Sequence, residues 1–290
     1  MHSLGRMFGF GFNYQASVIV LTIRDAPLPA LVGLVSGTVA AGMMQFAVRI
    51  ALTIASIDDI VSRIAFPAFA RLQGHPDKQA KALDLAILMT GLIVIPAQCG
   101  IAALAPVLVP LVFGSQWSGA ILPIQILCLG TLFRFPARYL RQAEFADGES
   151  KRALGMSTAT AILALAAFVL GLIWWGLPGS AVGFLVGAVL GLVASIWLAR
   201  DMSGVSWGRF WLMVGAGVAA GTGALLTLHM NGQWQGLTWV PSQSFLSGVV
   251  ASGIAAVVFG VACVALLVVT NRPALEVGWR LARQAMWRKS

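Results

Sequence analysis

Long apolar runs separated by short polar islands dominate the pattern along this chain. A helix that crosses a bilayer needs about 20 mostly apolar residues. Eight runs reach or approach that length, and we therefore predict eight membrane-spanning helices. They cover residues 7–23, 30–54, 85–104, 121–135, 153–174, 181–198, 210–228 and 245–269.

Glycine and proline mark the turns between these runs. Two prolines follow Arg24, and the segments 113–117 and 175–179 both contain glycine. Proline removes a helical hydrogen bond, and glycine accepts backbone angles that other residues avoid. Pro106 and Pro110 are expected to kink or break the third helix for the same reason.

The basic residues predict the orientation of the helices in the membrane. Residues 49–84 form the first polar island, and we expect a basic cytoplasmic loop there, because Lys and Arg are rarely translocated. Alternation of eight helices then places both termini in the cytoplasm and leaves Arg24 as the one basic residue outside. Arg134, at the inner end of the fourth helix, is counted with Arg138 and Arg141 in the inner loop that follows.

Composition agrees with this topology. Hydrophobic residues make up 59% of the chain and charged residues 10%, whereas soluble domains carry about 25% charged residues. The net charge of +9 is spread over many islands, so a soluble fold and a nucleic-acid partner are both excluded. The three cysteines and three histidines are scattered, which gives no metal or disulfide pattern, and no cofactor is expected.

The predicted fold is all-α, a polytopic bundle of membrane helices. Residues 1–200 form six helices, residues 201–271 add two trailing helices, and residues 272–290 form a cytoplasmic tail. Leu275 and Trp279 share one helical face of that tail. This pattern favours an amphipathic helix lying on the lipid surface, with a solvated tail as the alternative.

Few residues suggest catalysis. The predicted outer side carries no Ser/His/Asp set and no paired carboxylates. Asp58 and Asp59 are adjacent at the end of the second predicted helix, where they suit either a divalent metal or a helix N-terminus. We do not expect an enzyme.

A transporter instead needs polar groups that face an internal cavity, because polar groups facing lipid are costly. Basic groups at such a cavity suit an anionic substrate. Hydrogen bonds between helices and snorkelling of the arginines remain the alternative reading. The candidate substrate-binding residues are Arg6, Asn13, Gln15, Gln45 and Arg49.

Four segments resemble the polysaccharide, or O-antigen type, flippases of the multidrug/oligosaccharidyl-lipid/polysaccharide exporter superfamily. The clearest is the Arg-Ile-Ala-Phe-Pro-Ala-Phe-Ala-Arg-Leu-Gln sequence at residues 63–73. The other three agree in order and spacing, and they cover residues 32–47, 104–117 and 143–148.

The resemblance implies a bacterial inner-membrane protein that moves undecaprenyl-diphosphate-linked oligosaccharide between leaflets, with basic cavity residues attracting the diphosphate. Family members have two lobes, and this chain resembles the second lobe with two trailing helices. A first-lobe segment or a separate subunit is then an expected partner, alongside the lipid bilayer. The alternatives are a drug or cation exporter of the same superfamily, a membrane-embedded glycan transferase or ligase, and an inactive truncated remnant.

Overall fold

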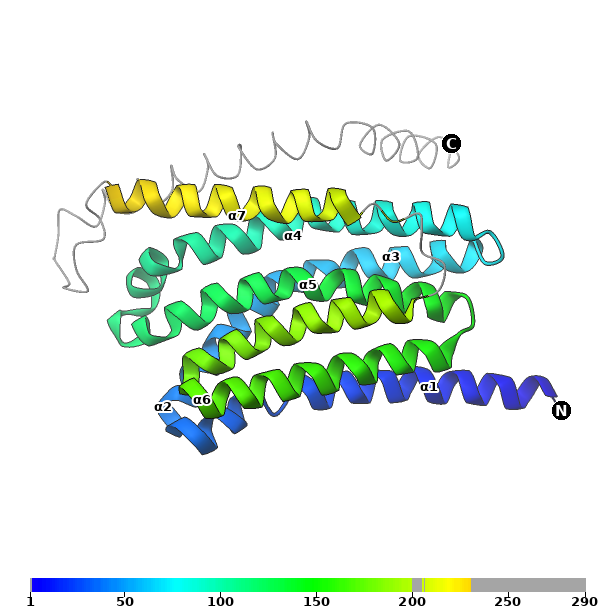
Figure 1. Cartoon of the computed structure of the whole chain (residues 1–290), viewed down its shortest axis with the longest axis horizontal. Helices are drawn as coiled ribbons and strands as arrows, with labels where there is room; N and C mark the ends of the chain where they lie inside the picture. The colour runs from blue at the N-terminus through cyan, green and yellow to red at the C-terminus, as the bar shows by residue number, and fades with distance from the viewer. Residues whose placement is uncertain (1, 200–204, 206, 231–290) are drawn as a thin grey trace.

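The computed structural model describes residues 2–199, 205 and 207–230, and all regular structure in them is helical. The elements are α1 (His2–Asp25), α2 (Leu28–Ala55), α3 (Ile57–Arg71), α4 (Pro76–Phe113), the 3₁₀ helix η1 (Ser115–Ala120), α5 (Ile121–Ala146), α6 (Ser150–Leu198) and α7 (Trp207–Met230). Figure 1 shows them as a bundle of long helices running back and forth. The eighth predicted span and the amphipathic tail lie outside the described residues.

Four segments of the described chain are long and apolar enough to cross a membrane. They are Phe8–Thr53, Pro76–Phe113, Ser115–Ala146 and Ser150–Leu198. The first combines the first two predicted helices, and the last combines the fifth and sixth. The prediction of an all-helical membrane protein is therefore confirmed.

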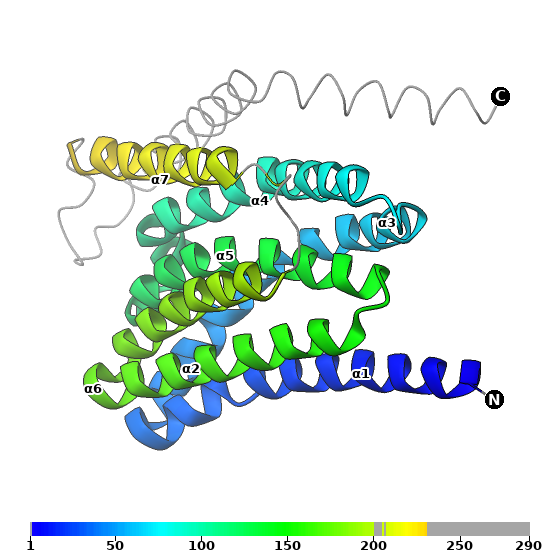
Figure 2. The same cartoon turned by 45° about the vertical axis from the view of Figure 1, so that its right-hand side comes forward.

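Glycines make the sharp bends that the sequence predicted. Gly176 interrupts α6 with a φ of 62°, and α6 folds back there as a hairpin (Figures 1 and 2). Gly114 has a φ of 92° and ends α4 before η1. Both angles lie where a Cβ atom would be strained, so glycine is needed at each turn. The prolines at 96, 106 and 110 do not end α4, which continues to Phe113.

Two expected loops are helical. The segment 49–84 contains the end of α2, all of α3 and the start of α4, so it is a helical hairpin rather than a loop. α5 continues to Ala146, well beyond the predicted end at residue 135. Charged residues suggested a loop at both places, but a charged helix is stable when its charges have partners or leave the hydrocarbon.

Helix α4 is longer than the hydrocarbon layer of a membrane is thick. At 1.5 Å per residue the 38 residues of α4 measure about 57 Å, against about 30 Å for the hydrocarbon core. At the N-terminal end of α4, the Gln73 side chain donates to the Asp147 carbonyl oxygen at 3.2 Å. The Gln79 side chain donates to the Asp147 carboxylate at 2.9 Å. These bonds attach the α3–α4 hairpin to the turn between α5 and α6.

Helix α5 lies at the centre of the bundle and contacts α2, α3, α4 and α6. One apolar core joins it to α3, α4 and α7 through side chains that include Phe69, Phe135 and Phe210. A second core joins it to α2, α4 and α6 and includes Phe168. Figure 2 shows α7 alongside α4 and α1 alongside α6, at opposite edges of the bundle. Because α5 is central, its polar face is directed toward the space between α1, α2 and α6.

Candidate anion-binding cavity

A cavity of about 790 Å³ lies between α1, α2, α5 and the two halves of α6. Its volume is within the range of small-molecule sites, about 300–1,000 Å³. Apolar side chains such as Phe168 and Phe184 line one part of it, and a group of charged side chains lines another. The charged lining residues are Arg24, Asp25, Asp59, Arg134, Arg138 and Arg141.

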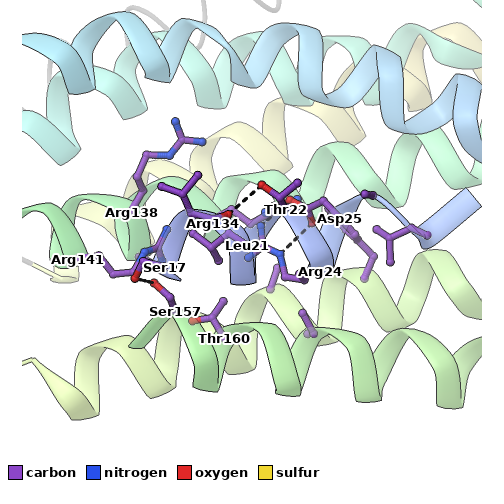
Figure 3. A pocket seen from close by; sticks show the side chains of 18 of the residues that line it. Ser17, Leu21, Thr22, Arg24, Asp25, Arg134, Arg138, Arg141, Ser157 and Thr160 are labelled. Carbon is purple, nitrogen blue, oxygen red and sulfur yellow. Dashed lines mark hydrogen bonds and ion pairs between the residues drawn. The ribbon is translucent and has the colours of Figure 1, made fainter. Parts of the chain in front are cut away.

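Three of the four arginines come from one face of α5. Arg134, Arg138 and Arg141 are spaced four and three residues apart, which places them on the same side of a helix. Figure 3 shows these side chains along α5, with Arg24 and Asp25 approaching from the end of α1. The same i, i+4, i+7 spacing was visible in the sequence. We assigned the three residues to a loop because they were charged, and that assignment was wrong.

Asp25 pairs with two of the arginines. Its carboxylate accepts from Arg24 at 2.7 Å and from Arg134 at 2.5 Å. Arg134 also lies over the ring of Phe184, 5.2 Å from its centroid. The turn between α1 and α2 therefore meets α5 near its middle. The placement of Arg24 on the outer side of the membrane stays a prediction.

Arg138 pairs with two carboxylates of α3. Its Nε lies 3.2 Å from Asp58 Oδ2, and its Nη1 forms an ion pair with Asp59. The Arg138 side chain still keeps 37% of its surface exposed. This arginine is thus held by the protein on one side and open to the cavity on the other.

Arg141 differs from the other three arginines. It is 8% exposed, yet it makes no hydrogen bond or ion pair with any residue in the described part of the chain. A buried charge without a partner is expensive. Four arginines face three aspartates here when Asp58 is included, so the cluster has a net charge of one positive. Arg141 is the arginine in this cluster that has no contacting carboxylate among the described residues.

The predicted site residues are not brought together. Gln45 lines the cavity. Asn13 donates to Ser150 Oγ at 3.0 Å, which joins α1 to α6. Gln15 and Arg49 are exposed and do not line the cavity. Arg6 belongs to the first turns of α1, where the structure describes the backbone alone. Apart from Gln45, the cavity is built from residues that our sequence reasoning did not select.

The shared carboxylate gives a first prediction. Asp25→Asn removes the charge that holds Arg24 and Arg134 together, and we expect a loss of about 2 kcal/mol in the free energy of unfolding. Breaking fully buried pairs costs about 3–5 kcal/mol, and Asp25, with 31% of its side chain exposed, should cost less. Thermal unfolding of the purified protein measures this. Asp77→Asn, at an exposed position in the first turn of α4, is the control, and equal losses would contradict the role of Asp25.

Comparison with known proteins gives consistent matches. The family described as "Polysaccharide biosynthesis protein" matches residues 1–122. An uncharacterised membrane protein in the cps region of Klebsiella pneumoniae is 24% identical over 197 residues, which cover 67% of this chain and 41% of that protein. The lipopolysaccharide biosynthesis protein WzxC of Escherichia coli K12 is 27% identical over 139 residues, covering 48% and 28%.

A solved structure has the same fold. The lipid II flippase MurJ, in an inward closed conformation, matches with a TM-score of 0.66 and 12% identity, covering 89% of this chain and 53% of that chain. The chain therefore spans about half or less of the length of the proteins it matches. By sequence the chain is similar to polysaccharide biosynthesis proteins, and its fold is similar to that of the MurJ structure. These likenesses and the long apolar helices support a multi-pass protein of the bacterial inner membrane.

Proposed function

We propose that this chain takes part in the transfer of a lipid-linked oligosaccharide across the membrane, and that its cavity binds the diphosphate of that lipid. Arg141 is the main support for this site, because it is a buried cation that lines a cavity and has no partner in the described residues. An anionic ligand would supply the missing charge. Arginine also presents a planar set of donors that suits phosphate oxygens.

The surroundings of Arg141 suit a diphosphate carried on a lipid. Arg138, one turn away, has an exposed side that could contact a second phosphate. Gln45 and Gln142 line the same cavity and offer amide groups to a sugar. Of the residues predicted from sequence, Gln45 joins this proposed site, while Arg6, Asn13, Gln15 and Arg49 stay as untested predictions.

The proposed activity is transport without covalent chemistry, with an undecaprenyl-diphosphate-linked glycan as substrate. WzxC is a lipopolysaccharide biosynthesis protein and MurJ is a lipid II flippase, and the likeness to both supports this substrate class. A drug or cation exporter is less well supported, because each cavity acid, Asp25 and Asp59, already pairs with an arginine. No group of three or more potential metal-binding side chains occurs in the described residues.

The proposal includes a second bundle. Alternating access requires two bundles that move against each other around a shared site. This chain matches 53% of the MurJ chain. We propose that it supplies one wall of the substrate path, and that another bundle, in the same polypeptide or in a separate subunit, supplies the other.

The test compares two ligands that differ only in the charged group. We expect purified protein in lipid nanodiscs to bind farnesyl diphosphate at least about tenfold more tightly than farnesol, because charged hydrogen bonds contribute about 1.5–3 kcal/mol. The preference should weaken as salt increases. Isothermal titration calorimetry measures both affinities. Equal affinity for the alcohol and the diphosphate would overturn the anion site.

A further inference from the structure

Asp58 is a buried carboxylate with an incomplete set of partners. It is 2% exposed, and its Oδ2 pairs with Arg138 at 3.2 Å. Its Oδ1 has no hydrogen-bond partner in the described part of the chain. The charge of Asp58 therefore depends on Arg138, whose other side is open to the cavity.

The groups around Asp58 come from the helices that pack on α3. Helix α5 presents Arg138, Arg141 and the hydroxyl of Tyr139. Helix α4 contributes Thr90, whose hydroxyl lies 2.7 Å from that of Tyr139. No charged group of α2 interacts with Asp58 among the described residues. Within the described part of the chain, Arg138 is thus the one cation in direct contact with this carboxylate, since Arg141 acts on it only at a longer range.

We infer that Asp58 is a proton-binding site that is loaded when an anion in the cavity draws Arg138 away from it. This inference rests on the proposed function, because it requires an anionic ligand at Arg138. Asp59 offers no such site, since its side chain is 52% exposed and water can solvate its charge.

Each step balances in charge and protons. The anion replaces Asp58 as the partner of Arg138. The Asp58 carboxylate is then buried without a cation in contact. One Asp58 oxygen then accepts a proton from water, and the side chain becomes a neutral carboxylic acid. No other bond forms or breaks. When the anion leaves, Arg138 returns and the proton is released to water.

Electrostatics favour this exchange. Helix α3 lies outside the candidate membrane spans, and burial raises the pKa of the Asp58 carboxyl while Arg138 opposes that rise. Removing the attraction of Arg138 leaves the effect of burial, so the pKa rises further. Coupling between two sites is reciprocal, and proton binding at Asp58 therefore strengthens anion binding.

The experiment measures proton uptake directly. We expect farnesyl diphosphate, added to wild-type protein in nanodiscs, to produce a protonated-carboxyl band in the infrared difference spectrum. Asp58→Asn should remove that band, and Asp77→Asn, a control at an exposed position away from the cavity, should keep it. The wild-type spectrum alone is informative, so the test does not depend on the folding of a variant.

A second readout is the pH dependence of affinity. The bound state holds more protons, so the Kd of the wild-type protein should rise with pH by up to about tenfold per unit. Asp58→Asn should reduce this slope relative to Asp77→Asn, and the comparison between the two variants also corrects for protonation of the ligand. A bound diphosphate with no carboxyl band, or with the same slope in both variants, would overturn the proton site alone. No binding to the wild-type protein would overturn the proposed function itself.

Discussion

Replacing Arg141 with glutamine is expected to remove most diphosphate binding and, at the same time, to make the protein more stable. Arg141 is 8% exposed, and its guanidinium has no partner in the described residues. An interaction of that group with a phosphate contributes about 1.5–3 kcal/mol, so the Kd of farnesyl diphosphate should rise by about 10- to 100-fold. Titration calorimetry of the variant in nanodiscs measures this change.

The gain in stability follows from the same geometry. A buried charge without a counter-ion opposes folding, and replacing buried charges by neutral groups has stabilised proteins by about 1–4 kcal/mol. We expect Arg141→Gln to raise the free energy of unfolding by about 1 kcal/mol in the absence of ligand. Farnesyl diphosphate should raise the Tm of the wild-type protein and leave that of the variant unchanged.

Two further variants make the result specific. Arg71→Gln removes an exposed arginine at the end of α3, away from the cavity, and it should change neither affinity nor stability appreciably. Arg141→Lys keeps the charge but loses the planar donors, so its affinity should fall between those of wild type and Arg141→Gln. A destabilised Arg141→Gln protein with unchanged affinity would show that Arg141 is structural and not a ligand-binding group.

A methyl group added at Gly183 is expected to separate the two halves of α6. The Cβ atom would overlap the carbonyl oxygen of Ala167 and lie 2.7 Å from the Cα of Phe168. Backbone atoms cannot rotate away as a side chain can, so the helices must move apart. Overpacking costs about 1–3 kcal/mol, and we expect Gly183→Ala to lose about 3 kcal/mol in the free energy of unfolding.

Gly155→Ala is the matched control in the same helix. No atom lies within 4 Å of a Cβ built at Gly155, and alanine is a better helix former than glycine by about 0.5–1 kcal/mol. The control should therefore be as stable as wild type or slightly more stable. Thermal unfolding in detergent compares the two variants. Equal stability would mean that the α6 hairpin is not closely packed at Gly183.

The four arginines of the cavity differ in how far they are already paired within the protein, and so in whether they can bind a ligand. Asp25 holds Arg24 and Arg134 together, so their main contribution is to the shape of the cavity. Arg138 exchanges partners, and Arg141 has none in the described chain. Removing the Asp25 charge should therefore lower the free energy of unfolding, whereas removing the Arg141 charge should weaken diphosphate binding without destabilising the protein. This separation is what distinguishes a binding site from a network that only holds the helices together.

The sequence by itself determined the class of the protein. Helix formation in a membrane follows from long apolar runs, because every backbone group in the hydrocarbon layer needs a partner. The bends at Gly114 and Gly176 also followed from local residues, since a positive φ favours glycine at each. The four segments at residues 32–47, 63–73, 104–117 and 143–148 together, in their order and spacing, suggested the family.

The tertiary structure alone decided where the charges lie. Hydropathy counts an arginine in the same way whether it faces the cytoplasm or an internal cavity, so Arg134, Arg138 and Arg141 were placed in a loop. Their partners are far away in the sequence, as with Asp25 and Arg134, which are 109 residues apart. Pairing over such separations depends on which helices pack together, and the spacing of residues along one helix carries no information about its neighbours.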